Sequence, residues 1–212
     1  ATPKFISTED LEEMGAKAII SNTFVLHLKP GEELIKRLGG IKKFMNYNGI
    51  NVTDSGGFQM YSPSLYIKSE EAGVAFRNPN SGQKLFISPE QDMKIQLDLG
   101  SDIAMCLDSM PLIENSKPEV KKAVELTTKW ALRCKNEHDK LQKKVKKEKK
   151  QLLFGICQGG IHKDLRKLSA KQISKIAFDG YAIGGLALGE PINSELAMIK
   201  IAKSQLPKES II

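Results

Sequence analysis

Short apolar segments alternate with amphipathic segments along this chain, and no other feature limits its fold as strongly. Five segments have the length and the apolar or β-branched composition of buried strands: residues 18–22, 51–54, 102–107, 152–156 and 181–183. Segments with helical periodicity lie between and after them. Successive strand–helix units predict a parallel sheet whose crossovers are helices.

Start and stop signals mark the expected helices. Ser88, Pro89 and Gln91 form an N-terminal capping sequence, and Gly100 ends that helix after Leu99. Ser116 and Glu119 open a long helix whose apolar positions step by three and four: Val120, Val124, Thr127, Ala131 and Cys134. Further helices are expected over residues 7–15 and 30–38, from Gly160 to about Phe178, and from a cap at Asn193 to about Ser204.

One region interrupts the alternation. Residues 74–77 and 84–87 have strand patterns and flank the turn-rich sequence 78–82, which predicts a β-hairpin. We therefore expect an insertion of about residues 66–87 on one rim of the fold.

A (β/α)₈ barrel fits this order better than a doubly wound open sheet. Each expected strand is followed by polar or glycine residues, and barrel sites form where strands end. The sequence contains no G-x-G-x-x-G turn, the motif that begins a doubly wound sheet of the dinucleotide-binding kind. A complete barrel needs eight strands and about 250 residues. We therefore expect residues 1–212 to form one partial barrel domain.

The sequence from Thr53 to Gln59 combines a strand end with groups that suit a flat ligand. The strand ends on Asp54, Gly56 and Gly57 allow a sharp turn, and Phe58 supplies a ring for stacking. Alone, this segment fits equally well a strand with a capping Asp and a Gly-Gly turn.

The strand ends taken together are more specific than any one of them. Asn22, Asp54, Asp108, Gln158 and the Gly184–Gly185 backbone would meet at one rim of a barrel. Two carboxylates can accept hydrogen bonds from the ring and exocyclic N–H groups of a base, whereas an amide or a backbone N–H can donate to the carbonyl of the base. This donor and acceptor set matches the edge of a guanine-like base, although each Asp alone is more commonly a cap or a surface acid.

Composition excludes several classes of protein. No apolar run approaches the roughly 18 residues that span a bilayer, and the N-terminus lacks a signal-peptide layout. The three cysteines are odd in number and far apart, which argues against a disulfide framework and a cysteine metal site. We expect a cytoplasmic protein with no membrane segment and no metal site in this chain.

The net charge of +7 is concentrated in one segment. Residues 140–150 contain seven lysines and one glutamate, a local charge of +6 (7 − 1), which leaves +1 (7 − 6) for the rest. Two interpretations stay open for this Lys-rich segment: a solvated helix end, or a contact with RNA phosphates.

The chain resembles the tRNA-guanine transglycosylase family over nearly its whole length. The matching motifs, in order, are Ser21-Asn22-Thr23-Phe24, Leu28-Lys29-Pro30-Gly31, Thr53-Asp54-Ser55-Gly56-Gly57-Phe58-Gln59, Gly100-Ser101-Asp102-Ile103-Ala104-Met105 leading to Asp108, Phe154-Gly155-Ile156-Cys157-Gln158-Gly159-Gly160, and Gly180 to Glu190. Each motif is moderately specific, and their order and spacing together are strongly specific.

The resemblance implies a (β/α)₈ barrel that exchanges a guanine in tRNA for a 7-deazaguanine, such as the precursors of queuosine or archaeosine, or queuine. By the family pattern, Asp54 is the catalytic acid/base at the ring nitrogen of the base. The same pattern assigns base binding to Ser55, Gly56 and Gly57, which shape the turn, and to Phe58, which stacks on the base. It also assigns hydrogen bonds with the base to the side chains of Asp108 and Gln158 and to the backbone of Gly185 and Leu186.

Two departures from the family pattern qualify the resemblance. The family's nucleophilic aspartate lies well beyond Gly185, and its zinc site would lie C-terminal to Ile212, so no cofactor is expected within this chain. The family's bacterial members usually continue after the equivalent of Asp108 with an acidic residue and Cys, whereas Ser109 and Met110 follow here. A bulky Leu188 favours a small 7-substituent on the incoming base.

Three interpretations follow. The first is a transglycosylase fragment or subunit, acting on tRNA and a guanine or 7-deazaguanine base, as a homodimer or with a complementing chain. The second is a non-catalytic tRNA-binding partner subunit. The third, ranked last, is an unrelated barrel lyase or hydrolase that uses Asp54 and Asp108 as an acid/base pair.

Overall fold

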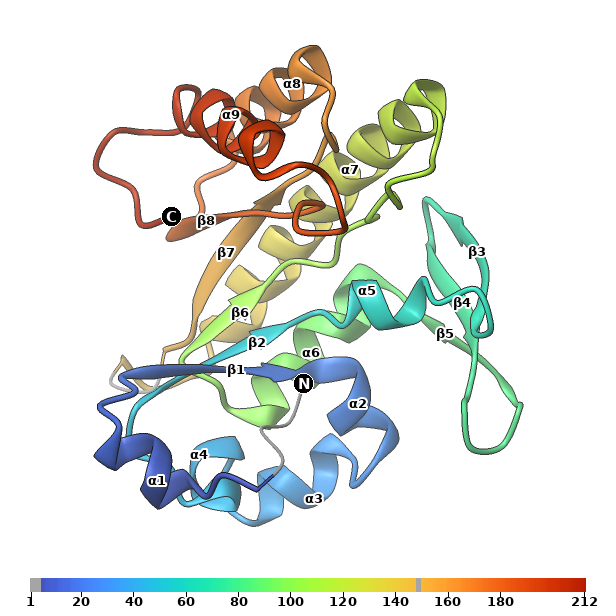
Figure 1. Ribbon diagram of the computed structural model, residues 1–212. Helices are drawn as coiled ribbons and strands as arrows, with labels where there is room; N and C mark the ends of the chain where they lie inside the picture. The colour runs from blue at the N-terminus through green and yellow to red at the C-terminus, as the bar shows by residue number, and fades with distance from the viewer. Residues whose placement is uncertain (1–4, 148–149) are drawn as a thin grey trace.

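A five-stranded parallel sheet forms the centre of the computed structural model, which describes residues 5–147 and 150–212 (Figure 1). Its strands lie side by side in the order β1 (Ala18–Asn22), β2 (Ile50–Asp54), β6 (Ile103–Met105), β7 (Leu152–Cys157) and β8 (Gly180–Ile183). This order is also the order along the chain, and the neighbours pair in parallel, with Asn22 opposite Asp54 and Cys157 opposite Ile183. The predicted parallel α/β sheet is confirmed.

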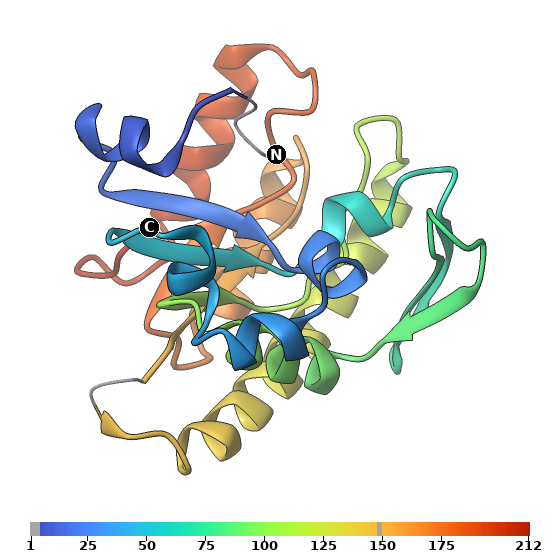
Figure 2. The same cartoon turned by 90° about the horizontal axis from the view of Figure 1, so that it is seen from below.

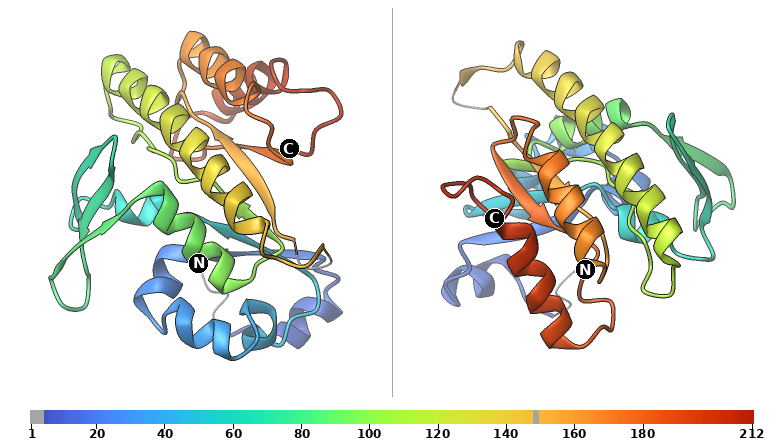
Figure 3. Two further views of the ribbon diagram at one scale, coloured as in Figure 1. Left: turned by 180° about the vertical axis from the view of Figure 1, so that it is seen from behind. Right: turned by 90° about the horizontal axis from the view of Figure 1, so that it is seen from above.

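Helices connect the strands and pack against one another in chain order. The long crossover helices are α6 (Pro89–Leu99), α7 (Lys117–Gln142), α8 (Lys163–Ile173) and α9 (Ile192–Lys203), and α7 and α8 both contact β7 (Figure 3). Shorter helices are α1 (Thr8–Glu13), α2 (Thr23–Leu28), α3 (Glu32–Arg37), α4 (Ile41–Met45) and α5 (Gly57–Met60). The capping boxes predicted at Ser88 and Ser116 are confirmed, because both reciprocal contacts of each box are present.

Four predicted boundaries are wrong. The helix expected from Gly160 to about Phe178 begins at Lys163 and ends at Ile173. The helix expected over residues 30–38 begins only at Glu32, because Gly31 is its N-cap, and an additional helix, α2, precedes it. The last helix is capped by Pro191, so Asn193 lies inside its first turn. The strand expected over residues 102–107 ends at Met105; the N–H of Cys106 still donates to the carbonyl of Phe154 over 3.0 Å, after which the chain leaves the sheet.

A second, antiparallel sheet stands to one side of the main sheet (Figures 1 and 2). It consists of β3 (Tyr66–Glu70), β4 (Gly73–Arg77) and β5 (Lys84–Ile87) in that order. The predicted hairpin of β4 and β5 is confirmed. The sequence pattern missed β3, whose alternately exposed and half-buried residues leave little apolar signal.

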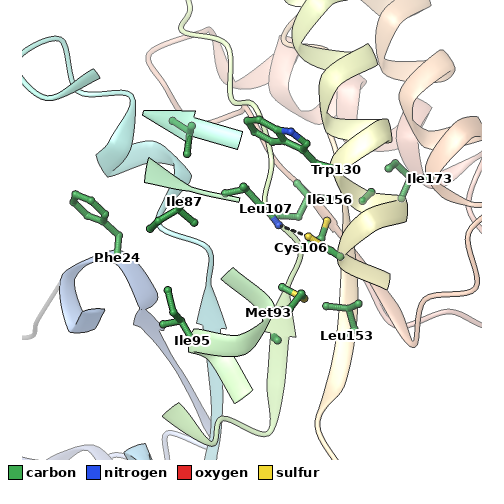
Figure 4. Close-up of a cluster of buried hydrophobic side chains, with 14 of the residues drawn as sticks. Phe24, Ile87, Met93, Ile95, Cys106, Leu107, Trp130, Leu153, Ile156 and Ile173 are labelled. Carbon is green, nitrogen blue, oxygen red and sulfur yellow. Dashed lines mark hydrogen bonds between the residues drawn. The ribbon is translucent and has the colours of Figure 1, made fainter. Parts of the chain in front are cut away.

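The apolar core fills the space between the main sheet and its helices. Leu153 of β7, Trp130 of α7, Ile173 of α8 and Met93 of α6 belong to one cluster of buried side chains (Figure 4). The apolar positions predicted for α7 (Val120, Val124, Thr127, Ala131 and Cys134) are all at most 3% exposed. Burial of this face holds α7 across the sheet.

The outer strands of the main sheet are not paired with each other in the described residues. A parallel bridge between Gly180 and Ile211 adds one further position beside β8. The three cysteines are free and buried. No helix in residues 5–147 and 150–212 is long and apolar enough to cross a membrane.

Candidate active site

Asp54 ends β2, and Asn22, at the end of the neighbouring β1, holds its carboxylate. The Nδ2 of Asn22 donates to Oδ1 of Asp54 over 2.8 Å, and the backbone N–H of Gly56 donates to the same oxygen over 2.9 Å. Asn22 is itself fixed as the N-cap of α2, where its Oδ1 accepts from the N–H of Val25 over 2.9 Å. The strand register therefore sets the orientation of Asp54.

The turn after Asp54 needs glycine for two separate reasons. Gly56 has a φ of +78°, and a Cβ there would lie 2.2 Å from Cβ of Phe24. A Cβ on Gly57 would lie 2.9 Å from Oδ1 of Asp108. The turn thus brings the β2 segment close to the loop after β6. The side chain of Phe58, for which stacking was predicted, lies outside what the structure describes.

Asp108 and Gln158 meet although 50 residues separate them. The Nε2 of Gln158 donates to Oδ2 of Asp108 over 2.5 Å, and the hydroxyl of Ser55 donates to Oδ1 over 3.3 Å. Asp108 is 7% exposed and Gln158 is fully buried. The Oε1 of Gln158 has no hydrogen-bond partner in the described part of the chain. A buried acceptor of this kind is available to a ligand.

The Gly184–Gly185 backbone completes the cluster. A Cβ on Gly185 would lie 2.3 Å from Oε1 of Gln158, and a Cβ on Gly184 would lie 2.7 Å from its Nε2. Gly185 also has a φ of +64°. The amide of Gln158 therefore packs directly on this bare backbone, and half-buried Leu186 follows it. The strand-end groups predicted from the sequence, apart from the Phe58 ring, gather at the carboxyl edge of the sheet.

Burial shifts the acidity of both predicted carboxylates. Removal from water raises the pKa of Asp54, although the hydrogen bond from Asn22 partly opposes this. Burial raises the pKa of Asp108 to about 6; its hydrogen bonds with Gln158 and Ser55 oppose the shift, and the nearby charge of Asp54 adds to it. A third acid, Asp92 of α6, is fully buried, and its pKa is raised well above the usual range. Two acids of raised pKa at a strand edge suit proton transfer near neutral pH.

Several supporting residues were not predicted. Gln96 of α6 accepts from the Thr53 hydroxyl over 2.8 Å and donates to the carbonyl of Met105 over 2.8 Å, which ties β2 to β6. Arg166 and Ser169 of α8 bind the loops after β7 and β8. Both carboxylate oxygens of Glu190 accept from the backbone, at 2.7 Å from Ala187 N and 2.9 Å from Leu188 N.

A sequence signal existed for three of these residues. Arg166 and Ser169 share the spacing of the buried positions Ala170 and Ile173, so they lie on the apolar face of α8. A charged residue on such a face indicates a buried partner. Gln96 lies on the buried face of α6 in the same way.

The Lys-rich segment, in its described residues 140–147 and 150, lies at the opposite edge of the sheet. It runs from the last turn of α7 to the residue before Gln151, just ahead of β7, whereas Gln158 follows the other end of that strand. Six strand residues at about 3.3 Å each separate the two by roughly 20 Å. Glu148 and Lys149 fall outside the described residues. In the described ranges no three His, Cys, Asp or Glu side chains are grouped so that they could hold a metal ion.

The fold and the site define an α/β protein with a buried polar site at the carboxyl edge of a parallel sheet. The model of the Queuine tRNA-ribosyltransferase family matches residues 1–212. A protein named Queuine tRNA-ribosyltransferase from Staphylococcus aureus (strain bovine RF122 / ET3-1) is 47% identical over 209 residues, which are 99% of this chain and 53% of that protein. Its counterpart from S. aureus strain JH9 is 46% identical with the same coverage.

The chain therefore belongs to the queuine tRNA-ribosyltransferase family, as the sequence motifs indicate. It spans about half the length of the curated relatives it matches.

Proposed function

We propose that this chain is the base-binding part of a tRNA-guanine transglycosylase, which exchanges a guanine in tRNA for a 7-deazaguanine. The main support is the contact between Asp108 and Gln158 beside the Gly185 backbone, with one buried Gln158 oxygen left without a partner. This set offers acceptors and donors side by side, as the edge of a guanine requires. Family membership and the names of the relatives point to the same chemistry.

Asp108 and Gln158 recognise the base in this proposal. With a pKa of about 6, Asp108 is mainly ionised at pH 7 and can accept from the two N–H groups on one edge of guanine. The Gln158 amide and the N–H groups of Gly185 and Leu186 contact the remaining polar atoms. Gly56 and Gly57 leave room for the flat ring, and Phe58 stacks on it.

Asp54 transfers the proton at the ring nitrogen of the exchanging base. Its raised pKa makes it a better proton acceptor near neutral pH than an ordinary carboxylate. Asn22 orients one of its oxygens, so the carboxylate does not have to reorganise during the transfer.

The proposal extends to the whole protein. The strand order β1-β2-β6-β7-β8 and the bridge at Ile211 support a closed (β/α)₈ barrel to which residues 1–212 contribute, with residues 66–87 as an insertion. tRNA and a free base are its substrates, and a second copy or a complementing chain is its partner. We place this activity in the cytoplasm because its substrate is tRNA.

Incorporation of radiolabelled guanine into unmodified tRNA by the full-length protein tests this function. We expect labelling that an excess of a small 7-deazaguanine base chases out of the tRNA. Binding of tRNA without any exchange would contradict the proposal and favour the non-catalytic partner subunit. Turnover of a small substrate without tRNA would instead favour the unrelated lyase or hydrolase.

A further inference from the structure

Arg166 is a fully buried cation that binds only backbone carbonyls. Its Nη1 donates to the carbonyl of Cys157 over 3.0 Å and to that of Gly184 over 2.8 Å. Its Nη2 donates to the carbonyl of Gly160 over 2.7 Å and, more weakly, to that of Gly185 over 3.4 Å. One side chain thus joins the loop after β7 to the loop after β8.

The charge of Arg166 has no direct counter-ion. None of the ion pairs among the described residues includes it, and its Nε has no hydrogen-bond partner there. Burial lowers its pKa to about 10, so it remains protonated at neutral pH. Taking a cation out of water costs free energy, and the carbonyl hydrogen bonds of Arg166 and the nearby charge of Glu190 offset part of that cost. The two loops that Arg166 binds are those that carry Gln158 and Gly185.

The contacts of Arg166 set the direction of two N–H groups. In a planar trans peptide the carbonyl and the N–H point in opposite directions. Because the Gly184 carbonyl points at the guanidinium, the N–H of Gly185 points away from it, and the same holds for the Gly185 carbonyl and the N–H of Leu186. None of the hydrogen bonds among the described residues uses either N–H.

The same side chain also holds the segment of Gln158. The Cys157 and Gly160 carbonyls lie on either side of Gln158 and Gly159. A Cβ on Gly159 would lie 2.6 Å from the backbone nitrogen of Arg166, so this loop lies directly on α8. The Gln158 N–H donates to the Ser169 hydroxyl, one turn further along the helix, over 2.9 Å.

We infer that Arg166 is a positioning residue for base recognition, which rests on the function proposed above. Its guanidinium fixes the loops after β7 and β8 so that the Gln158 amide and the N–H groups of Gly185 and Leu186 face the base together. It touches neither the base nor the tRNA. Lysine keeps the charge but cannot bind several carbonyls in one plane.

Arg166→Lys in the full-length protein, measured by guanine exchange, tests the inference. We expect the KM for guanine to rise at least tenfold while the KM for tRNA stays within twofold. Arg133→Lys is the control: Arg133 also binds two backbone carbonyls, those of Glu71 and Ala72, and it pairs in addition with Glu90, so none of its partners belongs to the site. That control should leave both KM values unchanged.

Chemical rescue separates positioning from a general loss of folding. In Arg166→Ala, millimolar guanidinium should restore part of the guanine affinity, whereas urea at the same concentration should not. An unchanged KM for guanine in Arg166→Lys, with exchange intact in the wild type, would overturn this inference alone. A wild-type protein without exchange would overturn the proposed function and the inference with it.

Discussion

Asn22 and Asp54 are joined at the ends of two neighbouring strands by a 2.8 Å hydrogen bond from Nδ2 to Oδ1. The same Nδ2 also donates to Oε1 of Gln59 over 2.8 Å. Asn22 therefore couples the first two strand ends to the turn that carries Gly56 and Gly57. Its hydrogen bond also opposes the effect of burial on the pKa of Asp54.

Replacing Asn22 should shift the pH dependence of exchange. In Asn22→Ala the pKa of Asp54 rises further, because the hydrogen bond to its ionised form is lost. The pH at which the exchange rate falls by half on the acidic side should therefore move upward. Asn22→Ala also loses the cap of α2, at a cost of about 1 kcal/mol. Asn22→Ser is the control: its hydroxyl can still cap the helix but is too short to reach Asp54, so it should show the pH shift with less loss of stability.

Asp108→Asn should flatten the stability profile of the protein in mildly acidic solution. The pKa of Asp108 in the folded protein, about 6, exceeds its value in an unfolded chain. The folded state therefore binds more protons between pH 4 and 6, and this contribution to stability is present at low pH and lost as the pH rises through 6. Two pKa units correspond to roughly 3 kcal/mol. Urea unfolding of the wild type and of Asp108→Asn at pH 4, 5, 6 and 7 measures this contribution to the free energy of unfolding.

Asp98→Asn provides a control of opposite sign. Burial raises the pKa of Asp98, but its ion pairs with Lys36 and Lys94 outweigh burial and lower it overall. Its contribution to stability is thus present at neutral pH and lost as the pH falls. For Asp108→Asn, a steeper loss of stability with rising pH than in the wild type would contradict the raised pKa of Asp108.

Gly185→Ala should weaken guanine binding more than its strain alone explains. The left-handed backbone costs an alanine about 1–2 kcal/mol, and the new Cβ would also meet Oε1 of Gln158. Gly82→Ala is the matched control, since Gly82 has a φ of +71° and open space around its Cβ position. Both variants should lose similar stability from strain, but only Gly185→Ala should raise the KM for guanine. Equal KM values in the two variants would separate Gly185 from the base site.

Reversing the charge of Lys143, Lys144, Lys146 and Lys147 should leave tRNA binding nearly unchanged. These residues lie at the edge of the sheet opposite the site, which favours the solvated interpretation. Each lysine on a phosphate would add about 1 to the slope of log affinity against log salt. The slope for tRNA should therefore change by less than about 1. A decrease of three or more in this salt slope would show that tRNA phosphates contact this segment.

The sequence predicted the sheet and the long helices because their signals are local. Ser88 and Ser116 open helices with their own neighbours, and the apolar spacing of α7 depends only on which face it buries. The clustering of the strand-end residues was also predictable, because parallel strands bring their carboxyl ends to one edge of the sheet. Asp108 and Gln158 could be placed together on that ground alone.

What the sequence missed depends on contacts between distant segments. The hydrogen bonds of Arg166 form only when the loops after β7 and β8 lie against α8, and those of Gln96 form only when β2 and β6 are neighbours. The strand β3 has no apolar run of its own and forms by pairing with β4. The cap at Pro191 depends on the loop before α9, whereas Asn193 carries the stronger local signal.

Guanine exchange by Asp54→Asn in the full-length protein is the most direct measurement of the proposed mechanism. Asparagine keeps the size of the side chain and an oxygen that can face Asn22, but it cannot take a proton. We predict that exchange of labelled guanine into tRNA falls at least 10²-fold, in the range of lost acid–base catalysis, with tRNA affinity within about twofold of the wild type. Exchange at the wild-type rate would contradict the role of Asp54 and the account of the site built around it.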